Sequence, residues 1–324
     1  MKQVNGQLLL TGIIAGMTAA LLVLGANAQP FLSSVLYAAS AMPILIVGLG
    51  WGNRTAIVAI AVASLIGAIA VSPIFALIMA AFMLLPAGWL AHLSNLARPA
   101  SEIGGPAHLT AWYPLSDILL HLCALVTLAV ILVGIMIGYG PELTDQIVDL
   151  VVSTMNEQNP AIATTAEEVA RLKSVTLLGI PIVQGGTWVM MLFAAYYIAT
   201  RIVSASGRAL RPREDIPSAL RMNRNALFVF LAGILGCFAG GTPALIGATL
   251  CGTFGAGFLI SGFASLHLRT RGKDWRVPAL ILVYLSMMML FPAFIVFILG
   301  LADTRRTVAL TPTVPGTGSD NPNS

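Results

Sequence analysis

Ionisable residues inside the long apolar runs are the first candidates for chemistry, because a charge in hydrocarbon is costly without a partner. Asp117 and His121 stand four residues apart. In a helix they share a face, where they could relay a proton or bind a ligand. Asp117 also follows Pro114 in what would be a first helical turn, where a carboxylate complements the helix dipole. We favour this capping role, and we do not expect an enzyme.

A second group of candidate residues lies in the apolar run 174–200, where Pro181, Gln184 and two glycines directly after it fall close together. Proline removes a backbone hydrogen bond, the glycines allow close approach, and the glutamine amide needs a partner away from lipid. Broken helices of this kind build solute sites in many transporters. We therefore predict that Gln184, Thr187 and Trp188 line a solute pocket. The alternative is a kinked helix in which Gln184 bonds to a neighbouring helix.

No spacing in the chain indicates a metal or a cofactor. Cys123, Cys237 and Cys251 lie in apolar runs without CxxC or Cys/His spacing, so they are expected to be small buried hydrophobes. Nothing resembles a nucleotide-binding loop, a nucleophile elbow or a metalloprotease helix. The net charge of +4 does not predict a nucleic-acid partner, because the basic residues follow the pattern of membrane sidedness.

The elements that would position these groups are membrane-spanning helices. Hydrophobic residues are 57% of the 324 and charged residues 9%, so a water-soluble globule would lack polar surface. At about 20 residues per span, the runs predict an all-α integral membrane protein with a bundle of about nine transmembrane helices. The expected crossings are 7–26, 31–50, 55–72, 73–94, 116–140, 174–200, 225–240, 242–267 and 277–302.

The first run has a second interpretation, as a secretory signal. Lys2, an apolar core and the small residues Ala26 and Ala28 resemble such a signal with its cleavage site. The core runs to about 19 residues, beyond the usual 7 to 15. A retained first helix is therefore favoured, and cleavage would leave eight crossings.

Lys and Arg in the connections predict which side of the membrane each connection faces. With the N-terminus inside, thirteen fall on the inner side and four on the outer side. This asymmetry predicts a multi-pass membrane protein with a cytoplasmic N-terminus. Arg305 and Arg306 count among the outer four, because an odd number of crossings leaves the C-terminus outside.

The crossings are expected to form one polytopic domain over residues 1–306. Its outer segment, near 141–173, carries apolar and acidic residues at helical spacing, which predicts an amphipathic helix. Thr165 and Glu168 then predict a capping box ahead of the next helix. Residues 307–324 are rich in Thr, Pro, Gly, Ser and Asn, and we expect them to form a disordered polar tail.

Six arginines are concentrated in the connection 201–224. Such a cluster fits binding to the anionic head groups of the lipid bilayer, and topogenic charge explains it equally well. The same loop supports an alternative function, a membrane scaffold or regulatory protein that contacts its partners there.

Small residues at a spacing of four let helices approach closely, and Ala15 and Ala19 predict such a face in the first run. Packing within the chain is the commoner outcome of this pattern. Docking on a partner membrane protein is the alternative.

The order of these elements resembles the uncharacterised YybS-like family of bacterial integral-membrane proteins. The likeness rests on the small-residue first run, the stretch AMPILIVGLGWG, and the ending LGLAD before Arg305 and Arg306. Members of that family look distantly similar to the substrate-binding S subunits of energy-coupling-factor transporters, although S subunits have six crossings.

The resemblance to S subunits implies that Ala15 and Ala19 dock on a membrane coupling subunit and that a small solute is captured from the outer side. It assigns no solute, because no vitamin-recognition signature is visible. Small-solute binding or transport is therefore the leading expectation for function, without an energy source in the chain itself.

Overall fold

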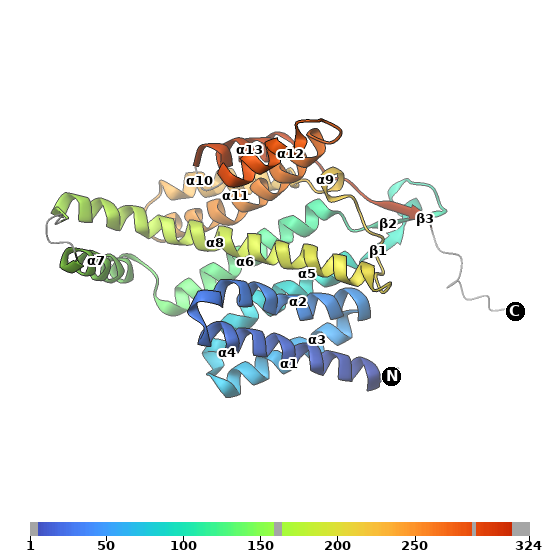
Figure 1. The fold of residues 1–324 in the computed structure, drawn as a ribbon, viewed down its shortest axis with the longest axis horizontal. Helices are drawn as coiled ribbons and strands as arrows, with labels where there is room; N and C mark the ends of the chain where they lie inside the picture. Colours follow the sequence, from blue (N-terminus) through green and yellow to red (C-terminus); the bar gives the residue numbers. More distant parts are fainter. Residues whose placement is uncertain (1–5, 159–163, 287–289, 313–324) are drawn as a thin grey trace, which may run out of the picture.

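The computed structural model describes residues 6–158, 164–286 and 290–312. Within these ranges the chain is a bundle of helices that carries a small β-sheet at one end (Figure 1). Seven of the described helical stretches are long and apolar enough to cross a membrane. They are α1 (Gly6–Ala28), η1 with α2 (Pro30–Leu32, Ser33–Trp51), α3 (Asn53–Ala70), α4, η2 and α5 (Pro73–Met79, Ala80–Leu84, Leu85–Ser94), α6 (Leu115–Ile137), α8 (Ala166–Ala205) and α11 (Gly241–Arg269).

The all-α membrane class is confirmed, but nine full-length crossings are not. Three further apolar helices in the described ranges are shorter, α10 (Asn225–Cys237), α12 (Arg276–Ser286) and α13 (Leu290–Ala302). α10 packs antiparallel to the start of α11, and its 13 residues would extend roughly 20 Å. It is shorter than the long spans, but it leads from the end of the bundle where Asn223 hydrogen-bonds Asp117 to the opposite end, where α11 begins.

The prediction of a single ninth crossing over 277–302 is not confirmed. α12 and α13 contain 11 and 13 residues, so each extends roughly 17 to 20 Å, a little over half of a 30 Å hydrocarbon core. The end of α13 returns to the end of α11, where Ser265 donates a hydrogen bond to Asp303 at 3.0 Å. α12 and α13 therefore form a helical hairpin that begins and ends at the same end of the bundle.

This hairpin places Arg305 and Arg306 at the end of the bundle that carries the sheet, called here the sheet end. The Arg305 backbone N–H donates to the Met222 carbonyl at 3.1 Å, and Arg306 pairs with Asp117. The expectation that these two arginines face the outer side, away from the 201–224 connection, is therefore wrong. Among the described residues, only Arg171 and Lys173 are basic groups at the opposite end.

The sheet joins segments that are far apart in sequence. β1 (Ala97–Pro99), β2 (Leu109–Trp112) and β3 (Leu310–Pro312) pair antiparallel in that order, and η3 (Ala100–Ile103) follows β1. The Trp112 indole N–H donates to the Thr311 hydroxyl at 2.9 Å.

The expectation of disorder from Thr307 onward is consequently wrong for residues 307–312, whereas 313–324 lie outside the described residues. Composition cannot reveal that a short strand finds its backbone partners in β2, some 200 residues earlier in the chain.

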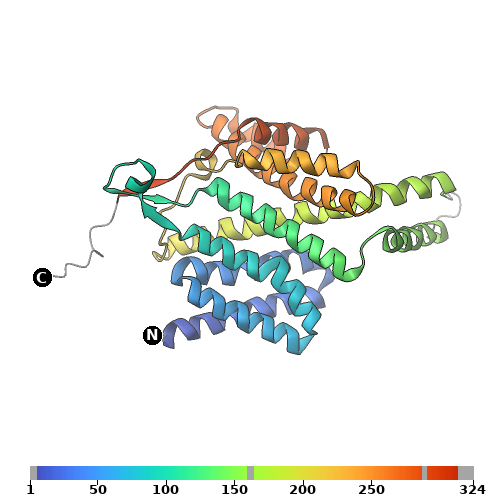
Figure 2. The ribbon, with the colours of Figure 1, turned by 180° about the vertical axis from the view of Figure 1, so that it is seen from behind.

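The opposite end, called here the α7 end, carries a helical pair that projects from the bundle (Figures 1 and 2). The expected amphipathic helix is α7 (Pro141–Gln158), which packs on the first turns of α8. The predicted capping box is confirmed, because the Thr165 N–H donates to the Glu168 carboxylate at 2.8 Å and the Glu168 N–H donates to the Thr165 hydroxyl. α8 has 40 residues and is roughly 60 Å long, twice the hydrocarbon thickness.

Glycines set the spacing of α8 and α11 in the centre of the bundle. A Cβ built on Gly252 of α11 would lie 2.6 Å from the Ile182 Cα, and one on Gly185 would lie 2.8 Å from a Thr253 methyl carbon. No ordinary Cβ approaches so closely, so these positions require glycine for the two backbones to touch. The two glycines beside Gln184 therefore pack the helix rather than break it.

Candidate functional site

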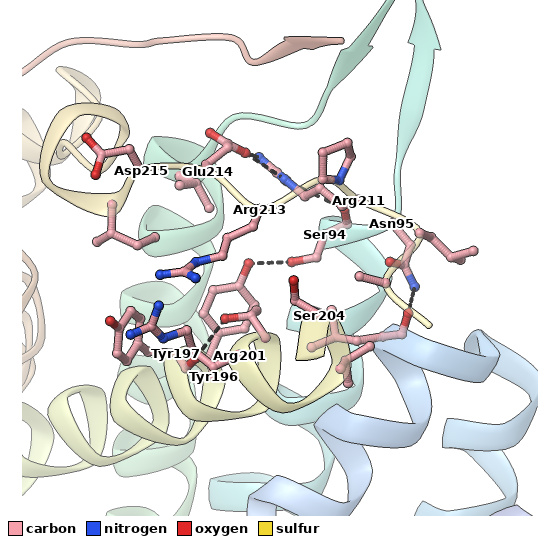
Figure 3. A pocket seen from close by; sticks show the side chains of 18 of the residues that line it. Ser94, Asn95, Tyr196, Tyr197, Arg201, Ser204, Arg211, Arg213, Glu214 and Asp215 are labelled. Atoms are coloured by element: carbon pink, nitrogen blue, oxygen red, sulfur yellow. Dashed lines mark hydrogen bonds and ion pairs between the residues drawn. The ribbon is translucent and has the colours of Figure 1, made fainter. Parts of the chain in front are cut away.

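A cavity of about 320 Å³ opens at the sheet end of the bundle (Figure 3). Its walls are the ends of α2 and α5, the start of α6, the last turns of α8, and residues 209–217 of the arginine-rich connection. α8 ends at Ala205, and Gly207 follows with φ of +70°, a conformation that glycine adopts at no steric cost. The chain then folds back over the last turns of α8 and closes the cavity.

Two ion pairs hold this returning segment in place. The Arg211 Nε donates to the Glu214 carboxylate at 2.7 Å, and Arg211 also reaches the Ser94 carbonyl at the end of α5. Asp215 pairs with Arg271 of the α11–α12 connection at 2.8 Å. The hydrogen bond from Arg271 holds the pKa of Asp215 below its ordinary value, so this carboxylate stays charged at neutral pH.

The remaining arginines of the cavity have no such partner. Arg201 comes from α8 and Arg213 from the returning segment, and Figure 3 shows both guanidinium groups directed into the same space. Within the described ranges neither forms an ion pair with a carboxylate, and the Arg201 guanidinium lies only over the Tyr197 ring, 5.4 Å from its centroid. Glu214 and Asp215 also line the cavity, but each is paired with another arginine, so the charges of Arg201 and Arg213 favour an anion.

Neutral polar groups complete one wall of the cavity. The Ser94 and Tyr196 hydroxyls share a hydrogen bond of 2.6 Å, and the Asn95 amide donates to the Gly48 carbonyl at 2.9 Å, which ties α5 to α2. Ser204 also faces the cavity (Figure 3). These groups can hydrogen-bond the oxygens of a ligand.

Apolar side chains also line the cavity, among them Leu49, Leu115 and Val203. The site thus combines cationic groups with hydrophobic groups, a combination suited to a ligand that has an anionic head and a less polar body.

The predicted solute residues do not meet in one pocket. α8 is continuous through Pro181, and the Leu177 carbonyl that the proline leaves without its usual partner accepts a hydrogen bond from the Tyr139 hydroxyl at 3.0 Å. Gln184 lines a second cavity of about 230 Å³ near the α7 end of the bundle.

Trp188 instead packs inside the bundle, where its ring stacks on Phe82 at 5.0 Å between centroids. Thr187 is exposed on α8 and lines neither of the two cavities. Of the three predicted residues, only Gln184 therefore lies at a cavity, and it does so on a helix that is not broken.

Ala15 and Ala19 lie in an internal seam of the bundle. They are 7% and 0% exposed, in a helix that packs closely on α2 and α3. Nearby, a Cβ on Gly16 would lie 2.5 Å from the Ala59 carbonyl oxygen. The small residues of α1 thus serve packing within the chain, and the predicted docking face is not on the surface.

Asp117 and His121 do not form a side-chain pair. The Asp117 carboxylate lies in the first turn of α6, as the helix dipole favours, and accepts hydrogen bonds from Arg306 at 2.7 Å and Asn223 at 2.5 Å. The His121 imidazole hydrogen-bonds the backbone carbonyl of Asp117 at 2.8 Å rather than its carboxylate, and its ring lies beside Trp89 and Tyr113. Asp117 thus joins three distant segments at the sheet end rather than relaying a proton.

The sequence identified the arginine-rich connection but not the cavity that it closes. Its six arginines look alike in the sequence, whereas the structure separates Arg211, which is paired, from Arg201 and Arg213, which are not. The contribution of Ser94 and Asn95 has no local sequence signal, because they reach the site only through the packing of α5 against α2 and α8.

These features define the chain as a polytopic α-helical membrane protein with a basic cavity at one end. A family model described as "Predicted membrane protein (DUF2232)" matches residues 16–304, and the chain belongs to this family. No curated protein and no solved structure matches it. The expectation of a polytopic membrane family is confirmed, and the likeness to S subunits stays a prediction.

Proposed function

We propose that this protein binds a phosphate-bearing anion in the cavity at the sheet end. The observation that carries the proposal is the convergence of Arg201 and Arg213 on one space without a carboxylate between them in the described part of the chain. A guanidinium group presents a planar fork of donors that matches phosphate oxygens, and such charge-assisted bonds are stronger than neutral ones. Hydroxyl groups of Ser94 and Ser204 are placed to complete the set of donors.

The cavity supports a ligand larger than phosphate alone. Its volume of about 320 Å³ is in the range of sites for small organic molecules, and its apolar side chains would contact the rest of such a ligand. Phosphorylated metabolites and phospholipid head groups share this chemistry. Basic pockets between transmembrane helices on the cytoplasmic side are known to bind anionic head groups.

The orientation follows from the same charges. The described basic residues gather at the sheet end, with only Arg171 and Lys173 at the α7 end. The retention of positive charge in the cytoplasm therefore favours a protein of the bacterial inner membrane, with its N-terminus and the cavity on the cytoplasmic side. An anion formed in the cytoplasm or an inner-leaflet lipid would reach this site directly.

Thermal unfolding of the protein in nanodiscs tests the proposal. A ligand that binds only the folded state raises the unfolding temperature. We expect pyrophosphate, added to phosphatidylcholine nanodiscs, to stabilise the protein if the ligand is soluble. We expect phosphatidylglycerol in the disc to do so if the ligand is a lipid. Arg201→Gln and Arg213→Gln should each abolish most of the effect.

The matched control is Arg208→Gln. Arg208 belongs to the same connection, but its guanidinium lies over the Trp51 ring, 4.7 Å from the centroid, and does not line the cavity. This variant should keep the full stabilisation. The proposal fails if neither anion stabilises the wild type, or if all three variants respond alike, since charge alone would then explain the effect.

A second candidate function is the binding of a small uncharged solute beside Gln184, as in a transport component that depends on a separate coupling subunit. The observation in its favour is that Gln184 lines the 230 Å³ cavity, whose walls are otherwise largely apolar. Gln184→Leu should abolish stabilisation by such a solute and leave the response to pyrophosphate unchanged. A screen of neutral metabolites that finds no stabilising compound would remove this candidate.

A further inference from the structure

Residues 303–312, called here the C-terminal strap, run from the end of α13 to the sheet across the face of the sheet end (Figure 1). The strap begins at Asp303, which accepts a hydrogen bond from the Arg221 Nε at 2.6 Å. Arg221 is fully buried, and its Nη1 donates to the Pro217 carbonyl at 2.8 Å. The first anchor of the strap is therefore connected to α9 (Ile216–Ala219) by a single side chain.

Two further anchors follow along the strap. Arg306 pairs with Asp117 of α6 at 2.7 Å, and the Thr307 hydroxyl donates to the Ala219 carbonyl at 2.9 Å. Beyond them the strap ends as β3, paired with β2. The strap thus binds α9 and the start of α6 at the same time, and it holds these two segments together.

The segments that the strap joins are walls of the basic cavity. Ile216 and Pro217 of α9 line it, and so does Leu115, two residues before Asp117. Arg213 lies three residues before Ile216 on the same returning segment. The position of this arginine therefore depends on how firmly α9 is held against α6.

We infer that the C-terminal strap is a latch for the cavity, so that docking of the strap and binding of an anion support each other. For its ligand the inference rests on the function proposed above. A docked strap holds Arg213 where the ligand needs it, which lowers the entropy lost on binding. By thermodynamic reciprocity, an anion in the cavity must strengthen the docking of the strap by the same factor.

The strap is built to release while the bundle stays folded. Arg306 is 55% exposed, so water and salt reach its ion pair with Asp117 from the solvent side, although Asp117 itself is buried. The strap also forms an edge of a three-stranded sheet, with β3 contributing three residues. The apolar packing between α8 and α11 does not involve it.

A charge swap tests the latch. Arg306→Asp places two carboxylates together and should release the strap, whereas Arg306→Asp combined with Asp117→Arg should restore docking. We expect Arg306→Asp to weaken pyrophosphate binding roughly five- to tenfold and the swapped pair to recover most of it. Hydrogen exchange of the amides of residues 307–312 should rise in the single variant and fall when pyrophosphate is added to the wild type.

A second measurement needs no ligand. Ser204→Cys places a thiol in the cavity, and its labelling by a water-soluble maleimide should be several-fold faster with Arg306→Asp than with Arg306 or the swapped pair. If labelling responds but pyrophosphate does not bind, the latch stands and the proposed ligand is wrong. If exchange shows a released strap while labelling and affinity are both unchanged, the strap is no latch.

Discussion

Replacement of Gly252 by alanine is the sharpest test of the packing that positions the cavity. The added methyl carbon would lie 2.6 Å from the Ile182 Cα and 2.8 Å from its carbonyl carbon, against about 3.4 Å or more for ordinary contacts. The neighbours are backbone atoms, which cannot rotate away, so α8 and α11 must separate by about an ångström. Overpacking of this kind costs about 1 to 3 kcal/mol of the free energy of unfolding.

Gly255→Ala is the matched control on the same helix. The nearest atom to its new methyl group would be a Phe230 ring carbon at 3.7 Å, an ordinary contact. Alanine is also the better helix former by about 1 kcal/mol, so this variant should be neutral or slightly stabilised. Both variants gain the same helix propensity, so unfolding followed by tryptophan fluorescence in nanodiscs should separate them by the overpacking cost alone, about 1 to 3 kcal/mol. Equal stabilities would refute the close contact of α8 with α11.

Three further predictions concern single contacts and topology. Tyr139→Phe removes the hydrogen bond to the Leu177 carbonyl and should lower the free energy of unfolding by about 1 kcal/mol, measured in the same assay; no loss would mean that another group satisfies the carbonyl. Burial raises the pKa of Asp303, but the Ser265 hydrogen bond and the charge of Arg221 outweigh burial and hold this pKa below its ordinary value. The ionised Asp303 therefore stabilises the folded protein fully above about pH 4, and this contribution to the free energy of unfolding is lost as pH falls through the folded-state pKa. Asp303→Asn should flatten this acid-side loss of stability, and an unchanged pH profile would contradict the assignment. Reporters fused after Lys273 and after Asp303 should lie on the same side of the membrane, and a reporter inserted near Gln158 should lie on the other side. If the reporter after Asp303 lies on the side of Gln158 instead, residues 277–302 form a ninth crossing.

The parts of the fold that sequence predicts are those set by local pattern. Apolar runs of about 20 residues locate the long spans, and the capping box at Thr165 locates the start of α8. The run 277–302 misleads, because its length suits a crossing while the return of the chain depends on contacts with α11 and Arg221. Length alone cannot distinguish a single span from two short helices that begin and end at the same end of the bundle.

In the candidate site too, the sequence predicts what local pattern sets and misses what depends on distant contacts. The arginine-rich connection is visible in sequence, but the pairing of Arg211 with Glu214 and the freedom of Arg213 follow from the path of the returning segment. The glycines beside Gln184 suggest a broken helix, yet the same residues suit close packing, and only the neighbouring helix decides between the two. Polar residues in apolar runs therefore locate sites less reliably here than charges at the ends of helices.

Native mass spectrometry of the protein extracted from its membrane tests the central claim most directly. If the cavity at the sheet end holds a phosphate-bearing anion, the wild type and Arg208→Gln should carry a bound molecule that contains phosphorus. The double variant Arg201→Gln with Arg213→Gln should be recovered folded and without it. Retention of the same molecule by the double variant would contradict the assignment of the cavity, and so would its absence from the wild type when pyrophosphate and phosphatidylglycerol are supplied.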